Sequence, residues 1–315
     1  MLLIGIASSA LFLWFVLRNA DVGAAWLALK DADRGLLLAA AVVVAFVYMA
    51  QALRWRVIAA TPSVPRRHFV ALVLAGIASN NVLPLRIGDL LRSRWLATAA
   101  RIPTGRGLGT VFRDRLCDVV VLLAFLLLTI PFVGSAVWER RIAVGGAAIV
   151  AVCAVVIAGA VLRRVLRPQP ERGGRSRLWR FVDDLLHEIA SPIGRRHIAA
   201  ALALSVLAWL TWAAAAGLVC RSLGIQLSAV DLVFATSVIN LGVVIPSAPG
   251  FIGTYQWLSV SALAAVGVDA DLALAFAFLM QAVWYLPTTV VGGPIALHEG
   301  GRDLLGRRYS GSRAG

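Results

Sequence analysis

The chain has 315 residues, of which 60% are hydrophobic and 15% are charged, and its formal net charge is +14 at pH 7. Several apolar runs approach the roughly 20 residues that span a bilayer, which excludes an ordinary soluble domain. The basic residues lie between these runs, where they indicate membrane orientation and attraction to anionic lipid headgroups. Nucleic-acid binding is excluded because the sequence contains no basic soluble module.

Hydropathy predicts an all-α fold, a polytopic membrane helix bundle. Two segments, 69–100 and 229–266, begin as apolar runs and are then broken by proline and glycine. Each is expected to be a re-entrant helical hairpin, although a true span followed by an amphipathic helix fits the hydropathy equally well. Six full spans are expected around them, at residues 2–17, 36–53, 111–132, 142–162, 198–220 and 272–297.

The distribution of arginine favours the hairpin interpretation. Residues 54–110 and 163–196 contain nine arginines each, and the tail from residue 298 contains four. With two hairpins, every arginine-rich segment lies on one side of the membrane, which the positive-inside rule assigns to the cytoplasm. We therefore expect a multi-pass protein of the bacterial cell (inner) membrane with both termini in the cytoplasm.

The order span, span, hairpin, span occurs twice, and three crossings per half make the two halves inverted repeats. The basic loop between them is expected to be a cytoplasmic linker with an interfacial amphipathic helix. The first repeat, with its hairpin, is expected at 1–135, and the first span of the second repeat at 136–163. The basic loop follows at 164–196. The rest of the second repeat, with its hairpin, is expected at 197–297, and a basic cytoplasmic tail at 298–315.

The first broken segment carries candidate residues for binding a lipid headgroup. Arg86 and Arg92 present planar guanidinium groups suited to bidentate binding of phosphate, next to the helix breaks at Pro84 and Gly88. Asp89 lies three residues before Arg92, so the two would face one way on a helix and pair. A simpler interpretation is a surface ion pair at the cytoplasmic boundary.

A second charged group, Asp114, Arg115 and Asp118, begins an otherwise apolar span. Ionisable groups within a span cost roughly 2.5–3.5 kcal/mol each unless they face partners or water. Asp118 lies about two turns into the span, and its expected partner is Arg115 on the same helix or Arg86 across a cavity. Arg115 joins the headgroup candidates, and the alternative is a self-neutralising pair that stabilises the bundle.

The break of the second segment, residues 246–253, contains no charge, so its chemistry would come from backbone groups and neutral side chains. The four histidines show no ligand spacing, and we expect no metal and no cofactor. The expected helix breaks of this segment are Pro246, Pro249, Gly250 and Gly253. Its polar candidates are Ser247, Tyr255 and Gln256.

In order and spacing, these motifs resemble the lysylphosphatidylglycerol synthase transmembrane, or flippase-like, family. The resemblance implies movement of a lipid to the outer leaflet; because the family's soluble synthase domain is not found here, lysyl transfer is not expected. Gln256 stands where the family usually has glutamate, which favours an anionic or glycosylated lipid. The matching positions are Pro84, Arg86, Gly88, Asp89 and Arg92; Asp114, Arg115 and Asp118; and Pro249, Gly250, Gly253 and Gln256.

The main hypothesis is therefore a flippase-like protein that binds or translocates a phospholipid or polyprenyl-linked lipid. A membrane-embedded transferase is an alternative, with Asp89 or Asp118 as its catalytic carboxylate. A non-catalytic scaffold, in which the polar residues only hold the bundle together, is another. Besides the lipid, the expected partners are a second copy of the chain or a separate lipid-modifying enzyme.

Overall fold

The fold is entirely helical in the part of the chain that the structure describes, and no strand occurs there. The expected all-α membrane bundle is therefore confirmed. The computed structural model describes residues 2–83, 86–133, 145–146, 151–163, 176–243 and 248–311.

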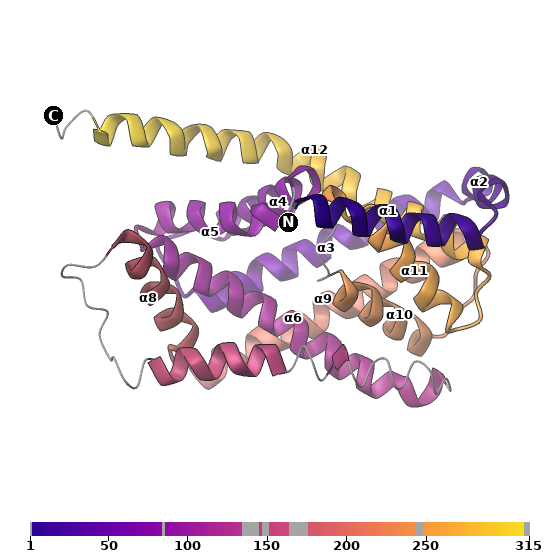
Figure 1. The fold of residues 1–315 in the computed structure, drawn as a ribbon, viewed down its shortest axis with the longest axis horizontal. Coiled ribbons are helices and arrows are strands. Elements are labelled where there is room, and N and C mark those ends of the chain that lie inside the picture. The colour runs from indigo at the N-terminus through magenta and orange to yellow at the C-terminus, as the bar shows by residue number, and fades with distance from the viewer. Residues whose placement is uncertain are drawn as a thin grey trace.

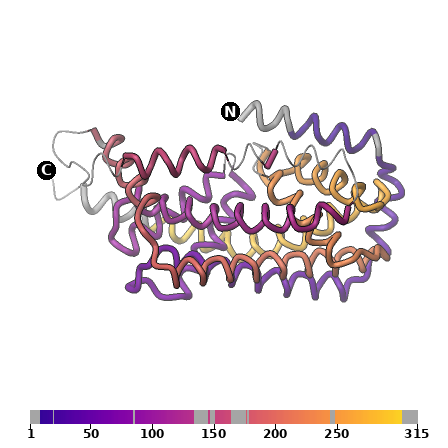
Figure 2. The backbone as a smooth tube through the Cα atoms, turned by 90° about the horizontal axis from the view of Figure 1, so that it is seen from below, coloured from indigo at the N-terminus to yellow at the C-terminus, as the bar shows by residue number. Residues whose placement is uncertain are grey.

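Four helices are long and apolar enough to cross a membrane, and they run along the long axis of the molecule (Figure 1). They contain the expected spans 36–53, 111–132, 198–220 and 272–297, which are confirmed. Figure 2 shows two of them, α3 and α9, side by side along their lengths, and fully buried alanines on both allow this close approach. The four helices are α3 (Arg34–Ala59), α6 (Thr104–Val133), α9 (Arg195–Ser222) and α12 (Ala270–Gly311).

The two remaining expected spans are not established as full spans. Helix α1 (Leu2–Asn19) begins near the middle of the bundle (Figure 1), and the chain bends by 89° before α2 (Val22–Asp31). Of the expected span 142–162, residues 142–144 and 147–150 lie outside the described residues, and its second half lies in the short apolar helix Ala151–Arg163. Among the described residues, four helices qualify as spans, or five if α1 and α2 form one, and the sixth expected span is only partly described.

Two pairs of short helices correspond to the expected hairpins, and within each pair the helices pack against each other. They contain 17, 14, 14 and 11 residues, fewer than the roughly 20 that cross a bilayer. One pair occupies the left half of the molecule and the other the right half (Figure 1). The pairs are α4 (Arg66–Val82) with α5 (Ile87–Ala100), and α10 (Ala229–Gly242) with α11 (Thr254–Ala264).

The tips of the two hairpins meet in the middle of the bundle. Arg86 Nη2, at the first tip, donates a hydrogen bond of 2.7 Å to the carbonyl of Val243 at the second. The expected breaks at Pro84 and Pro246, and the neighbouring Ser247, lie outside the described residues. The contact between the tips nevertheless brings segments about 160 residues apart into one site.

The amphipathic helix expected in the basic loop is present as α8 (Arg177–Ala190), and it packs along α6. Glycine on α6 makes this approach close, because a Cβ added at Gly105 would lie 2.3 Å from the carbonyl oxygen of Phe181. The buried Glu188 carboxylate accepts hydrogen bonds from Arg106 at 2.9 Å and from Arg113 at 2.7 Å. Packing and ion pairing together therefore fix α8 against the bundle.

Replacing Glu188 with alanine is expected to loosen α8. Removal of the carboxylate leaves the guanidinium groups of Arg106 and Arg113 without this acceptor, and hydrogen bonds to charged groups contribute about 1.5–3 kcal/mol each. Limited trypsin digestion should cut near α8 faster in Glu188→Ala than in the parent protein. Leu178→Ala, at a side chain that is 69% exposed on the same helix, is the control. Equal digestion rates in both variants would contradict the role of Glu188.

Candidate functional site

Two carboxylates on α6, Asp114 and Asp118, share one buried arginine from α3. Arg54 Nε donates to Asp114 Oδ1 at 2.7 Å, Nη2 donates to Asp118 Oδ2 at 3.0 Å, and Nη1 donates to Asp118 Oδ1. The expected partners of Asp118 were Arg115 or Arg86. The expected ion pair with Arg115 is present, with Arg115 Nη1 3.6 Å from Asp118 Oδ2, but the arginine that donates hydrogen bonds to Asp118 is Arg54.

A second set of ion pairs joins the first hairpin to α6. Asp89 Oδ1 accepts from Arg92 Nε at 3.0 Å and from Arg115 Nη2 at 2.9 Å, so the expected pairing of Asp89 with Arg92 is present. Arg92 Nη2 also donates to Asp114 Oδ2 at 3.3 Å, and its guanidinium lies 4.7 Å from the centre of the Trp55 ring. Arg92 is therefore committed to protein partners, which makes it a poor direct ligand for a headgroup.

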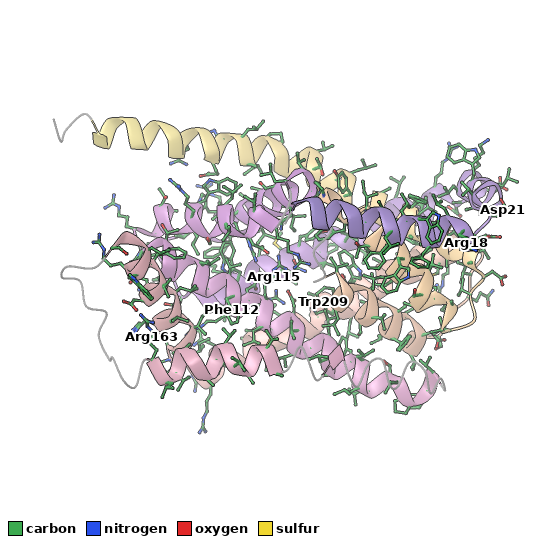
Figure 3. All side chains as sticks on the ribbon, viewed as in Figure 1. Arg18, Asp21, Phe112, Arg115, Arg163 and Trp209 are labelled. Atoms are coloured by element: carbon green, nitrogen blue, oxygen red, sulfur yellow. The ribbon has the colours of Figure 1, made fainter. Side chains whose placement is uncertain are left out.

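These three arginines and three aspartates form one continuous network whose formal charges cancel. Figure 3 places Arg115, one of its members, together with Trp209 in the middle of the bundle. Charge neutrality and mutual hydrogen bonding make such a network tolerable at membrane depth, where an isolated charge is costly. Its members are Arg54, Arg92, Arg115, Asp89, Asp114 and Asp118.

Arg86 lies outside this balance. It forms no ion pair with any described carboxylate. Instead, the Arg86 guanidinium donates a hydrogen bond to the Val243 carbonyl, and its Cζ lies 5.4 Å from the centre of the Phe251 ring. Arg86 and Phe251 both have left-handed backbone conformations, with φ of 53° and 61°. Such conformations are uncommon for residues other than glycine and often occur at functional sites. The extra cation is thus held where the two hairpin tips meet.

Arg86, Arg115 and Asp118 line a cavity of about 310 Å³ between the two hairpins and the long helices. This volume is at the lower end of the roughly 300–1,000 Å³ that ligand pockets occupy. Four amide side chains also line it, namely Gln51, Asn80, Asn81 and Asn240. Six aromatic side chains complete much of the wall, namely Tyr48, Trp209, Trp212, Phe251, Tyr255 and Trp284.

Gln256 does not reach this cavity and instead holds the second hairpin together. Its side chain is fully buried. Gln256 Oε1 accepts from the Gly253 amide at 2.7 Å, while its Nε2 donates to Gln281 Oε1 at 2.5 Å. Gln281 Nε2 in turn donates to the Gly250 carbonyl at 2.6 Å. Both glycines have positive φ, of 68° for Gly250 and 85° for Gly253, so the two amides stabilise a turn that only glycine adopts easily.

The family model described as the lysylphosphatidylglycerol synthase TM region matches residues 2–292 of the chain. The chain belongs to this family. Comparisons with curated proteins and with solved structures each gave no match. Together with the apolar helices, membership of the lysylphosphatidylglycerol synthase TM family makes this an integral, multi-pass membrane protein.

The three motifs on which the resemblance to this family rested converge in the structure. The first supplies Arg86 at one hairpin tip, and the third supplies the turn around Gly250 at the other tip. The second lies on α6 between them, where Arg115 and Asp118 face the cavity. Segments that are distant in the sequence therefore build one site.

Sequence reasoning missed Arg54, which binds both aspartates of α6. The expected span ended at residue 53, one residue short of it, whereas α3 continues to Ala59. The buried tryptophan Trp209, whose Nε1 donates to Asp118 Oδ1 at 2.8 Å, was missed as well. An arginine continuing the helical pattern of a span was the available signal for Arg54.

Within the described ranges, no group of three or more His, Cys, Asp or Glu side chains is arranged to hold a metal ion.

Proposed function

We propose that this protein binds the phosphate of a membrane lipid headgroup in the central cavity and moves the lipid between leaflets. The observation that carries the proposal is the position of Arg86, a cation without a described carboxylate partner, on the wall of that cavity. A guanidinium offers a planar fork of donors that matches phosphate. An anion entering the cavity would compensate the positive charge of Arg86, which lies outside the neutral network.

Arg115 is the second phosphate ligand in this proposal. It lines the cavity, and its side chain is 37% exposed, whereas the Arg54 side chain is completely buried. Arg115 Nε is buried and has no hydrogen-bond partner among the described residues. Asp89 holds Arg115 through its Nη2. Asp89 and Arg92 thus act as positioning residues, and Arg86 and Arg115 contact the headgroup.

The arrangement of the hairpins supports movement as well as binding. They extend from opposite halves of the bundle, and their tips meet at the cavity. Inverted repeats with broken helices at the midplane are typical of alternating-access transporters, in which one repeat moves against the other around a fixed site. The transferase alternative is weaker, because its candidate carboxylates, Asp89 and Asp118, are each held by two arginines.

Native mass spectrometry of the protein purified in mild detergent tests this proposal. We expect one class of phosphate-bearing lipid to be enriched over its abundance in the host membrane, and this enrichment to be lost in Arg86→Ala. Arg34→Ala is the matched control, because Arg34 is exposed at the start of α3 and should retain the lipid. Lipid that mirrors the host membrane in all three proteins would refute the site.

A further inference from the structure

We infer that the cavity is built for a phosphorylated polyol, meaning a lipid headgroup in which the phosphate carries a sugar, inositol or glycerol. This inference rests on the proposed function, since it assigns the chemistry of the group beyond the phosphate that Arg86 binds. It comes from the side chains on the cavity wall and from the hydrogen bonds that they have already made.

A cationic headgroup does not suit this wall. Asp118 is the only carboxylate among the described residues that line the cavity. Its Oδ1 accepts from Arg54 and Trp209, and its Oδ2 accepts from Arg54. A primary ammonium group has three donors and no acceptor, so it would find no free carboxylate there. It would also lie close to the positive charges of Arg86 and Arg115.

The four amides of the wall keep a mixture of donors and acceptors free. Gln51 makes no side-chain hydrogen bond to the described residues. Asn80 uses only Oδ1, which accepts from the Gly88 amide at 2.8 Å. Asn240 uses only Nδ2, and Asn81 Oδ1 is buried without a partner in the described part of the chain. Hydroxyl groups both donate and accept, so a polyol would satisfy the free groups of Gln51, Asn80 and Asn240 together.

Other headgroups would satisfy this wall less completely. A quaternary ammonium group could lie against the aromatic rings through cation–π attraction, but it forms no hydrogen bonds and would leave the amides unpaired. A bare phosphate would satisfy the arginines and leave the Asn240 carbonyl oxygen without a donor. Buried polar groups left without partners are costly. The amides therefore favour a polyol over choline and over unsubstituted phosphate.

Binding of short-chain lipids to the full-length protein in mild detergent tests the inference. The probes are dioctanoyl forms of phosphatidylinositol, phosphatidic acid, phosphatidylcholine and lysyl-phosphatidylglycerol, with soluble inositol 1-phosphate as a separate arm. We expect phosphatidylinositol to bind about tenfold more tightly than the other three lipids, the ratio that one or two hydrogen bonds provide. We expect inositol 1-phosphate to bind more weakly than the lipid.

Two variants separate the substrate class from the phosphate site. Gln51→Leu and Asn240→Leu keep similar volumes, and they should weaken phosphatidylinositol binding about tenfold while leaving phosphatidic acid within twofold of the parent protein. Arg86→Ala should weaken both lipids. Thermal unfolding of each variant identifies any that is misfolded, and having two amide variants keeps the test decisive.

The outcomes are distinct. Tightest binding of phosphatidylcholine or lysyl-phosphatidylglycerol, or unchanged phosphatidylinositol binding in both amide variants, overturns the polyol assignment and leaves the phosphate site standing. Inositol 1-phosphate binding as tightly as the lipid overturns the lipid as ligand. Phosphatidic acid binding that Arg86→Ala does not change overturns the proposed function itself.

Discussion

Replacing Arg54 with alanine is expected to cost the folded protein about 3–5 kcal/mol, the usual effect of removing one partner from a buried ion pair. Arg54 donates to both aspartates of α6 and to the Ser205 hydroxyl of α9 at 2.9 Å. Its removal leaves Asp118 with Arg115 at 3.6 Å and Trp209 at 2.8 Å. A carboxylate at membrane depth would then be incompletely compensated.

Thermal unfolding in detergent measures this effect, and we expect the midpoint to fall by on the order of 10 °C. Arg34→Ala, which removes an exposed arginine from the other end of the same helix, should shift the midpoint by no more than about 2 °C. If both variants unfold at the temperature of the parent protein, Arg54 does not hold the network together. The double variant Arg54→Met with Asp118→Leu should recover part of the loss, because an apolar pair replaces an ion pair.

The parts of the fold that could be predicted are those that a local pattern determines. Long apolar runs predicted six spans, because the bilayer sets their length, and four of these are confirmed. Proline and glycine at 84–88 and 246–253 predicted the breaks, because both residues interrupt helices. The end of α3 was not predictable from hydropathy, since the charge of Arg54 ends the apolar run and this residue lies buried only because α6 and α9 provide its partners. Proline alone does not predict a break, however, because Pro287 and Pro294 lie within α12 without ending that helix.

The sequence could predict most residues of the candidate site, but it could not predict most of the contacts between them. The pair Asp89–Arg92 follows from a spacing of three residues on one helix, and the structure has it at 3.0 Å. The contact of Arg86 with Val243 joins residues separated by 157 positions, and no spacing rule reaches that far. Likewise, Gln256 was expected among the functional polar groups, but tertiary packing buries it in the turn of the second hairpin.

Introducing a methyl group at Gly88 is expected to disrupt both the fold and the site. A Cβ at this position would lie 2.0 Å from the carbonyl oxygen of Gly76 and 2.7 Å from Asn80 Oδ1. These atoms belong to α4, so Gly88→Ala forces α4 and α5 apart and breaks the bond from the Gly88 amide to Asn80. Overpacking typically costs 1–3 kcal/mol and sometimes more. We expect about 3 kcal/mol here, because the first clash is with backbone.

The same change tests whether the hairpin positions Arg86, which lies two residues before Gly88. Separation of α4 and α5 moves the tip away from the Val243 carbonyl, so Gly88→Ala should lose bound lipid as Arg86→Ala does, although it keeps the arginine. Gly293→Ala is the matched control, because a Cβ there meets nothing within 4 Å and alanine favours the helix by up to about 1 kcal/mol. Retention of lipid by Gly88→Ala would mean that Arg86 binds without the hairpin's geometry. Loss in Gly88→Ala with retention in Gly293→Ala would tie the headgroup site to the packing of the first hairpin.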